Sequence, residues 1–494
     1  MNKSKVDIGP DTRGIIPREL KNFFSADGHS LILRGAPGTG KTTLALELLT
    51  FFKSSHDAYF ISGRIDEQVL KRHLNWIDFN VLLSKGKDYG SQLARKGMLS
   101  RKELDRLESR IEDGDETLEG DSDPEPGSGK VQNDTWTIDV TNLLPEIDKL
   151  YEKLEITQSG RAIIAIDSVD SLAERYGIAP RRLMHTIQKD LVERSNFNVI
   201  FVLETSVSNT LEFMGDGVVS LEMADIGGRR LRLMKLEKLR GQTIWNPIIL
   251  FSLASGHFDS FIEFLDPSIH DNHIDIINMD GFLQGIIEPG QYNLFEFEGT
   301  VPMKVIQSLS REIVKQASIV PRGVYTTMST RLFGRAPSTL LETHVKDYQN
   351  TIRFISPLSL LQKESEDVFT VQVAGKSFLE DFDWNTVKKI FPESRQPPVL
   401  LMDANHILSH YGLEAKNDVE NHIANLVSNN GTCIGFSWPS SNSVNVDFGM
   451  SNRLIKVRNQ GLNVLFYGEK PYSPIYVFAP TGHGNNAYGF RPML

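Results

Sequence analysis

The sequence has almost no cysteine, no long apolar run and no excess of positive charge. Its 494 residues include a single cysteine, Cys433, which excludes an internal disulfide and a zinc site built on cysteines. No apolar stretch approaches the roughly 18–20 residues that a membrane-spanning helix needs. The polar start of the chain shows no signal-peptide pattern. We therefore expect a cytoplasmic protein without a membrane association.

The charge balance bears on the choice of partner. The formal net charge is −10, from 53 basic and 63 acidic residues. Proteins that coat nucleic acid carry the opposite sign, and no tract here interleaves basic with aromatic residues for single strands. The balance therefore argues against DNA as a partner. At 40% hydrophobic residues, a chain of this length can bury more than one core.

One glycine-rich stretch gives the main indication of chemistry. It lies between an apolar strand pattern and a helix pattern and reads G-x-x-x-x-G-K-T, the phosphate-binding loop (P-loop). Glycines let backbone N–H groups turn toward a phosphate, and a helix N-terminus adds partial positive charge. We predict that Lys41 reaches the β- and γ-phosphates of ATP and that Thr42 holds Mg²⁺. The residues of the predicted ATP site are Gly35, Ala36, Pro37, Gly38, Thr39, Gly40, Lys41, Thr42 and Thr43.

Two carboxylates follow apolar runs that are typical of buried parallel strands. Asp167 ends the run at 161–166, and in P-loop proteins such an aspartate faces magnesium through water. Glu204 follows the run at 198–203. Because the carboxyl ends of parallel strands meet at one edge of a sheet, we expect both to converge on the P-loop. Lys41, Asp167 and Glu204 are therefore candidate catalytic residues.

The alternation of strand and helix patterns predicts a doubly wound α/β domain with a mostly parallel sheet. Within it, residues 112–133 differ in composition, because eight acidic residues stand among glycines, serines and prolines. Such a segment cannot bury enough apolar area to offset chain entropy, so we predict a disordered insertion. A docking role for the acidic tract is the alternative.

Basic residues cluster at 181–182 and again at 229–240. One interpretation of the second cluster is an edge hairpin with a solvated charged face. Another is that Lys238 and Arg240, two residues apart and so on one face of a strand, clamp phosphate charge. A third is that the arginines dock a protein partner. The candidate docking residues are Arg181, Arg182, Arg229, Arg230 and Arg232.

Over residues 1–255, the chain resembles the RecA-like ATPases of the KaiC branch. The resemblance rests on the Gly-x-Pro-Gly-Thr-Gly-Lys-Thr loop, the Ile-Asp-Ser strand end and the Arg-rich strand closing in Lys-x-Arg-Gly. Within that branch, the arginine clusters make it similar to archaeal gas-vesicle regulatory proteins. The resemblance implies Mg-ATP binding and homo-oligomers in which Lys238 and Arg240 reach the γ-phosphate bound by the adjacent protomer. It also implies action through a protein partner, a transcriptional activator in that family.

The chain departs from this family at the expected general base. KaiC-type ATPases place two glutamates directly after the second strand, whereas this sequence has Gly63 and Arg64 there. Asp66 and Glu67 are the nearest candidates to replace them. A missing base slows phosphoryl transfer while leaving nucleotide binding intact. We therefore expect ATP binding with slow hydrolysis.

The second half of the chain repeats the first. The corresponding segments are 279–299 with the lead-in to Gly35, 323–331 with 58–64, 399–403 with 163–167, and 454–458 with 236–240. The last pair aligns Lys456 and Arg458 with Lys238 and Arg240. Two tandem RecA-like domains explain the repeat, and chance similarity between two α/β domains is the alternative.

The second copy lacks a working P-loop. When Gly299 is aligned with Gly35, Lys304 stands one position early relative to Lys41, and Val305 cannot bind magnesium. We predict an ATP-binding domain at 1–265 and a degenerate RecA-like domain at 266–494.

Three functions are compatible with these features. The first is an ATP-binding regulator of the gas-vesicle type, whose nucleotide state controls its binding to a protein partner. The second is a recombination or repair ATPase, which would need hydrolysis stimulated by DNA. The third is a KaiC-like signalling scaffold with other partners.

Overall fold

The computed structural model describes residues in both halves of the chain. These are residues 15–63, 76, 80–83, 150, 160–204, 210–254, 256–261, 275–276, 287–319, 323–327, 329–334, 352–357, 370–373, 375–383, 397–438, 449–461, 463–480 and 487–493. The predicted insertion at 112–133 and the candidates Asp66 and Glu67 lie outside them. None of the helices in the described part is long and apolar enough to cross a membrane.

The chain divides into two compact units. The first comprises Met1–Glu222, Lys235–Pro247 and Gly256–Phe258, and the second comprises Met223–Met234, Ile248–Ser255 and Asp259–Leu494. The sequence suggested a single boundary at 265/266. In the structure the chain instead passes between the units several times from residue 222 to residue 259.

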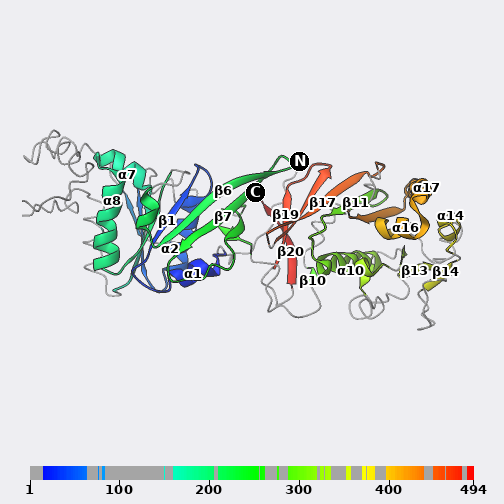
Figure 1. Cartoon of the computed structure of the whole chain (residues 1–494), viewed down its shortest axis with the longest axis horizontal. Helices are drawn as coiled ribbons and strands as arrows, with labels where there is room; N and C mark the ends of the chain where they lie inside the picture. Colours follow the sequence, from blue (N-terminus) through cyan, green and yellow to red (C-terminus); the bar gives the residue numbers. More distant parts are fainter. Residues whose placement is uncertain are drawn as a thin grey trace, which may run out of the picture. The chain divides into compact units, whose positions relative to one another are not determined.

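The first sheet and its helices occupy residues 18–260 (Figure 1). The elements are α1 (Arg18–Phe23), β1 (Ser30–Gly35), α2 (Lys41–Phe52), β2 (Asp57–Ser62), β3 (Asn80–Leu83), β4 (Ala162–Asp167), α7 (Val169–Tyr176), α8 (Pro180–Ile187), η2 (Gln188–Arg194), β5 (Asn198–Val202), η3 (Thr210–Met214), β6 (Gly217–Ile226), β7 (Arg229–Leu239), β8 (Ile248–Ser252) and β9 (Asp259–Ser260).

Strand β1 lies between β5 and β6, in the middle of the first sheet. The described strands follow the order β3-β2-β4-β5-β1-β6-β7-β8-β9, and those from β3 to β6 pair in parallel. The P-loop and Asp167 therefore lie at the same, carboxyl edge of the sheet. Ile32, Ile164 and Phe201 pack with residues of α7 and α8 in one buried cluster.

Local sequence signals set the ends of the helices around the site. Helix α7 begins after Ser168, whose hydroxyl accepts the N–H of Ser171, and ends at Gly177 in the left-handed conformation. Helix α8 has Pro180 at its first position, where a missing N–H costs nothing. The hairpin β6–β7 turns at Gly227 and Gly228, whose φ angles of 56° and 72° suit a two-residue hairpin turn.

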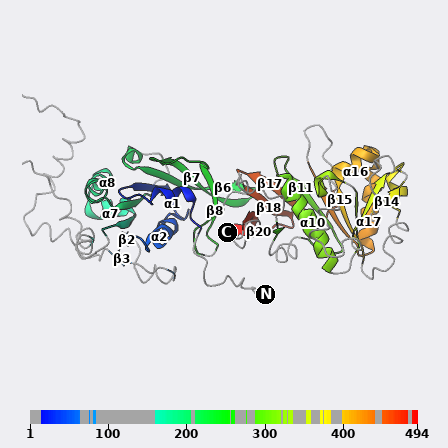
Figure 2. The same cartoon turned by 90° about the horizontal axis from the view of Figure 1, so that it is seen from below.

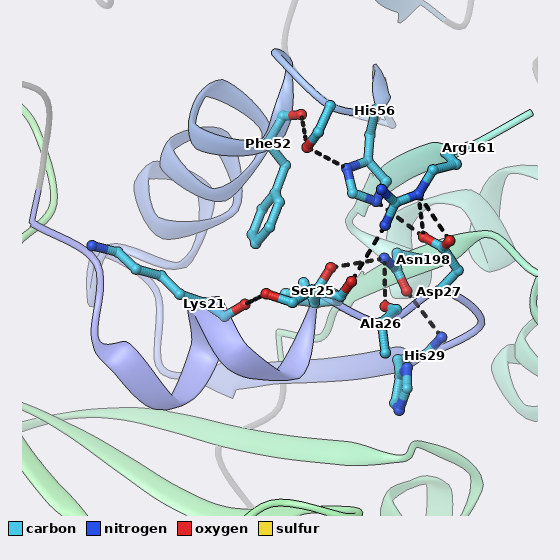
Figure 3. Close-up of polar contacts among 11 residues, drawn as sticks. Lys21, Ser25, Ala26, Asp27, His29, Phe52, His56, Arg161 and Asn198 are labelled. Carbon is cyan, nitrogen blue, oxygen red and sulfur yellow. Dashed lines mark hydrogen bonds and ion pairs between the residues drawn. The ribbon is translucent and has the colours of Figure 1, made fainter. Parts of the chain in front are cut away.

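A polar network holds the turn before β1 (Figure 3). This turn lies at the amino edge of the sheet, opposite to the edge that carries the P-loop. Arg161 Nε donates to both carboxylate oxygens of Asp27, at 3.0 and 2.8 Å, and His56 Nε2 lies 3.1 Å from Oδ1. Asn198 donates to two carbonyls of the same turn. Burial alone would raise the pKa of Asp27, but the hydrogen bonds from Arg161 and His56 outweigh it and hold that pKa below its usual value.

The second unit carries its own sheet and helices (Figure 2). The elements are β10 (Asp275–Ile276), β11 (Tyr292–Phe297), α10 (Met303–Ile319), β12 (Val324–Thr327), α11 (Thr330–Phe333), β13 (Ile352–Pro357), β14 (Thr370–Val373), α14 (Phe378–Asp381), β15 (Val399–Asp403), α16 (Ala404–Tyr411), η5 (Leu413–Ala415), α17 (Lys416–Ser428), β16 (Thr432–Ser437), β17 (Arg453–Gln460), β18 (Asn463–Lys470), β19 (Ile475–Pro480) and β20 (Ala487–Met493).

The second sheet repeats the strand order of the first. Its described strands follow β10-β20-β19-β18-β17-β11-β16-β15-β12-β13-β14. The stretch β13-β12-β15-β16-β11-β17-β18 corresponds, strand for strand, to β3-β2-β4-β5-β1-β6-β7. The strands from β13 to β17 pair in parallel, like their counterparts from β3 to β6. The prediction of two tandem α/β domains with mostly parallel sheets is confirmed.

The strand order corrects one part of the predicted repeat. Lys456 and Arg458 lie on β17, which corresponds to β6, whereas Lys238 lies on β7, whose counterpart is β18. Lys456 Nζ donates to Glu296 Oε1 at 2.6 Å. The alignment of Lys456 and Arg458 with Lys238 and Arg240 is therefore wrong. An alternation of basic and apolar residues suits any strand with one exposed face and cannot identify which strand it is.

Candidate nucleotide site

The P-loop has backbone angles that require glycine. Gly35, Gly38 and Gly40 have φ angles of 149°, 78° and 105°. A Cβ added at Gly35 would collide with the carbonyl oxygen of Leu221 on β6. Gly40 is also the N-cap of α2, so no side chain caps the first turn of that helix. The loop thus combines close backbone approach with a helix N-terminus, the features that a phosphate needs.

The side chain of Lys41 is directed back into the loop. It is 8% exposed, and its Nζ donates to the carbonyls of Gly35 at 2.6 Å and Ala36 at 3.0 Å. Thr39 closes the loop by donating its hydroxyl to the same carbonyl of Ala36 at 2.9 Å. The structure therefore holds the Lys41 ammonium at the glycine turn, where it would meet the phosphates of a nucleotide.

Thr42 and Asp167 come together as the sequence predicted. Thr42 Oγ1 donates to Asp167 Oδ2 at 2.6 Å, joining the start of α2 to the end of β4. Magnesium in nucleotide sites takes one or two protein oxygens, waters and phosphate oxygens. A hydroxyl beside a carboxylate suits that donor set, so these residues would hold Mg²⁺. The ion would supply neutralisation of phosphate charge.

Glu204 also lies at this edge and is held by Ser168, directly after β4, and by Asp170 in the first turn of α7. Ser168 Oγ donates to Glu204 Oε1 at 3.0 Å, and the backbone N–H of Glu204 donates to Asp170 Oδ2 at 2.7 Å. Sequence reasoning missed Ser168 and Asp170. The only available signal was their position directly after Asp167.

Gly63, at the first of the two expected glutamate positions, is closely packed. Its N–H donates to the carbonyl of Asp167 at 2.9 Å, and its carbonyl accepts from Arg175 at 2.6 Å. A Cβ there would stand 3.1 Å from Ser171 Cβ and 3.4 Å from Leu172 Cγ. That contact is tighter than ordinary packing, so helix α7 would have to yield to a side chain.

Lys238 and Arg240 lie far from the P-loop of their own chain. Lys238 Nζ donates to the carbonyl of Gly215 at 2.6 Å, and Arg240 Nη1 donates to Asp216 Oδ1 at 3.1 Å. Because β6 starts after Asp216 and runs parallel to β1, this is the amino edge of the sheet, whereas Gly35 lies at the carboxyl edge. Both side chains are exposed. Within one chain, they cannot clamp the phosphates that Lys41 would bind.

The five candidate docking arginines belong to different units and environments. Arg181 is exposed and Arg182 is half-buried, both in the first unit, whereas Arg230 is exposed and Arg232 is half-buried in the second. Burial, together with the charge of neighbouring Arg230, lowers the pKa of Arg232.

Arg229 corrects the docking prediction, because it is only 6% exposed. Its guanidinium donates to the carbonyls of Ser473 at 2.7 Å and Gly468 at 2.6 Å. The guanidinium also lies over the rings of Tyr467 and Tyr472, at 4.7 and 4.0 Å. A side chain committed to these contacts within the second unit is not available to a partner.

Strand pairing shows which residues of the second unit stand at the site positions. In the first unit Asp167 pairs with Val202, which pairs on its other side with Leu33. In the second unit Asp403 pairs with Phe436, which pairs on its other side with Phe295. Leu33 and Phe295 therefore correspond.

From this anchor, Phe297 stands at the place of Gly35, and each ends its strand. Met303 stands at the place of Lys41, and each begins its helix. Lys304 thus occupies the position of Thr42 rather than one before Lys41, so the alignment on Gly299 was wrong. The conclusion that this copy has no P-loop stands for the described residues 297–304.

Side chains fill the corresponding edge of the second unit. The ring of Phe297 stacks on that of Trp438 with centroids 5.3 Å apart. The Arg331 guanidinium lies over the same Trp438 ring, 4.9 Å from its centroid. Asp403 is 1% exposed and caps α16 by accepting from the N–H of His406 at 2.9 Å. The glycine that makes room for phosphate in the first unit is here an aromatic ring.

The N-terminal half of the chain is similar to known proteins. Residues 20–237 match the family described as GvpD gas vesicle protein, P-loop domain. The chain is 28% identical over 260 residues to protein GvpD2 of Halobacterium salinarum, and 29% identical over 257 residues to protein GvpD1 of the same organism. Each match covers 50% of this chain, and 45% and 41% of the respective relatives, so the chain spans under half of their length.

Proposed function

We propose that this chain, a GvpD-like P-loop protein, is an ATP-binding regulator of the gas-vesicle type that acts in the cytoplasm on a protein partner. The observation that carries the proposal is the hydrogen bond of 2.6 Å between Thr42 and Asp167 beside the P-loop lysine. In a glycine turn with no nucleotide role, neither a hydroxyl–carboxylate pair nor a buried lysine would be needed at this place.

In this proposal, each site residue has one role. Lys41 neutralises the β- and γ-phosphates, and the backbone N–H groups of the loop receive their oxygens. Thr42 binds Mg²⁺ directly, and Asp167 binds it through water. The second unit contributes no second nucleotide site, because Phe297, Met303 and Lys304 stand where the first unit has Gly35, Lys41 and Thr42.

Hydrolysis is slow in this proposal, so that the bound nucleotide marks a state rather than driving rapid turnover. The support is that Gly63 stands where KaiC-type ATPases place a glutamate, and that a Cβ there would lie 3.1 Å from Ser171 Cβ, so α7 would have to shift to admit a side chain. General-base catalysis contributes roughly 10²–10⁴-fold, so a chain without the glutamate at this position would keep its phosphate contacts and hydrolyse ATP more slowly than KaiC-type ATPases do.

The proposed oligomer follows from the position of Lys238 and Arg240 at the sheet edge opposite to the P-loop. There they are exposed and can meet the nucleotide of another protomer. A triphosphate with magnesium keeps uncompensated negative charge, and a lysine with a planar arginine would neutralise it. ATP would then favour assembly.

The proposed partner is a transcriptional activator, as in gas-vesicle regulation. The proposed docking side chains are the exposed Arg181 and Arg230 and the half-buried Arg182 and Arg232. The test is to measure binding of this chain to the candidate activator with a slowly hydrolysed ATP analogue and with ADP. We expect capture that depends on the nucleotide and is lost in the Lys41→Ala variant.

The same preparation separates the other candidates. Hydrolysis that single-stranded DNA raises many-fold would support a recombination ATPase and overturn the regulator. Nucleotide-dependent capture of signalling proteins, with no binding of the activator, would support a KaiC-like scaffold instead.

A further inference from the structure

The first unit has a second set of polar residues beside its P-loop, and the second unit has different residues at each of these positions. Strand pairing makes Asp167 correspond to Asp403. Ser168 and Ala404 each come one residue later, and Asp170 and His406 each come three residues later, so these residues correspond too. Strand pairing also makes Glu204 correspond to Trp438. The unit with Lys41 and Thr42 thus has a serine, an aspartate and a glutamate where the unit without them has alanine, histidine and tryptophan.

The hydroxyl of Ser168 has a fixed orientation. Its oxygen accepts the N–H of Ser171, as the N-cap of α7, at 3.3 Å. Its single proton is directed to Glu204 Oε1 at 3.0 Å. Ser168 is 1% exposed, so water does not compete for this proton. The hydrogen bond therefore holds one carboxylate oxygen of Glu204 in place.

Asp170 holds the backbone of the same residue. Its Oδ2 accepts the N–H of Glu204 at 2.7 Å, which fixes the chain just beyond the end of β5. Helix capping does not require this arrangement. In the second unit Asp403 itself caps α16, and the N–H of Trp438, at the place of Glu204, donates to Asn405 Oδ1 at 2.8 Å. A side chain of the first helical turn thus anchors this backbone in both units, whereas among the described residues a hydroxyl donor to a carboxylate is found here only in the first. A serine cap leaves Asp167 to face Thr42 and also provides a donor to Glu204.

We propose that Glu204 is the general base of the slow ATP hydrolysis and that Ser168 and Asp170 are its positioning residues. This inference rests on the proposed ATP-binding function. Glu204 would replace the glutamate that is missing at Gly63. It lies at the same edge of the sheet, after β5, which β4 separates from β2.

The proposed step is an in-line displacement. The water oxygen forms a bond to the γ-phosphorus, and the bond between that phosphorus and the bridging oxygen breaks, leaving its electron pair on ADP. One water proton passes to the Glu204 carboxylate, which later returns it to solvent. The products are ADP, inorganic phosphate and the regenerated carboxylate.

The test measures single-turnover hydrolysis of ATP and equilibrium binding of a fluorescent, slowly hydrolysed ATP analogue in the full chain. Glu204→Gln should lower the hydrolysis rate at least about 100-fold while the analogue binds within about threefold of wild type. Glu193→Gln, an exposed carboxylate on η2 of the same unit, is the matched control and should hydrolyse normally.

The positioning role has its own comparison. Ser168→Ala should slow hydrolysis about tenfold with unchanged analogue binding, and Ser168→Thr, which keeps a hydroxyl, should recover most of the rate. Ser195→Ala removes a serine hydroxyl that bonds only to a backbone carbonyl in the described structure, and should have no effect. A Ser168→Ala rate loss that Ser168→Thr does not recover would overturn the positioning role.

The outcomes separate this inference from the function on which it rests. If the wild-type chain does not bind the analogue, the proposed function fails and the inference with it. If it binds the analogue but does not hydrolyse ATP, or if Glu204→Gln hydrolyses at the wild-type rate, the inference alone is overturned.

Discussion

The hydroxyl of Thr42 donates to the carboxylate of Asp167 at 2.6 Å, joining the first residues of α2 to the last residue of β4. The two residues are far apart in the sequence but meet because β1 and β4 end at the same edge of a parallel sheet. Their pairing gives the first prediction.

Removing Asp167 should affect the magnesium dependence of nucleotide binding more than binding itself. Asp167→Asn keeps a hydrogen-bond acceptor for Thr42 but removes the charge, so the gain in ATP affinity on adding Mg²⁺ should fall roughly 10–100-fold. Titration of ATP analogue with Mg²⁺ and with EDTA measures that gain. An unchanged gain would show that Asp167 does not serve the metal. Asp190→Asn, which changes a carboxylate on η2 that is paired with Arg194, is the control.

Each chain should bind one nucleotide, through Lys41. Lys41→Ala removes a charge-assisted contact worth about 1.5–3 kcal/mol, or roughly 10–100-fold in affinity. Lys304→Ala, which changes the lysine next to the filled site of the second unit, should leave both affinity and stoichiometry unchanged. Two sites of similar affinity in a fluorescence titration would contradict the assignment.

Assembly should depend on nucleotide through Lys238 and Arg240. Light scattering of the full chain at micromolar concentration should show a larger particle with a slowly hydrolysed ATP analogue than with ADP. Replacing both residues by alanine should remove the difference while one nucleotide still binds per chain. Arg194→Ala, which changes an exposed arginine on η2, serves as control. A wild-type chain that is monomeric in both conditions would exclude the shared site.

Two neighbouring arginines should differ in their effect on stability. Arg229→Ala removes the guanidinium that donates to the carbonyls of Gly468 and Ser473 and lies over two tyrosine rings, and should cost about 2–4 kcal/mol in the free energy of unfolding of the second unit. Arg230→Ala, one residue on and exposed, should change it by less than about 0.5 kcal/mol. Urea unfolding with a probe in the second unit makes the comparison. Equal effects would mean that the Arg229 contacts contribute little.

Acid should weaken the network of Figure 3 in a defined direction. Asp27 has a folded-state pKa below the ordinary 3.8, so its stabilisation is fully present above pH 3.8. It is lost as the pH falls through the lowered value, because the folded carboxylate must then accept a proton. The stability difference between wild type and Asp27→Asn should therefore stay constant from neutral pH down to pH 3.8 and shrink below it. A difference that begins to shrink well above pH 3.8 would show that a group other than Asp27 controls it.

The features that the sequence could predict are those carried by local patterns. Gly35–Thr43 and Asp167 could be found because the loop chemistry and the apolar strand lie in one short stretch of chain. The tandem organisation could be found from four segments in the same order. The position of Lys304 could not, because only the pairing of Asp403 with Phe436 and of Phe436 with Phe295 fixes the register.

Whether a charged side chain is buried or exposed could not be predicted from the sequence either. Arg229 and Arg230 are adjacent and chemically identical, yet one is buried and the other exposed. The difference arises from acceptors at Gly468 and Ser473, which lie more than two hundred residues away in the chain. No local pattern around β7 contains that information.

The cap formed by Asp403 has a consequence for anyone who reads this sequence beside its relatives. A carboxylate that ends a strand and starts α16 is useful for folding alone, since it accepts from His406 and from the hydroxyl of Ser329. Substitutions of Asp403 would therefore be selected against even in a domain that binds no nucleotide. An invariant aspartate at this column of an alignment would then record the need to begin a helix, and a motif can outlive the reaction that it once served.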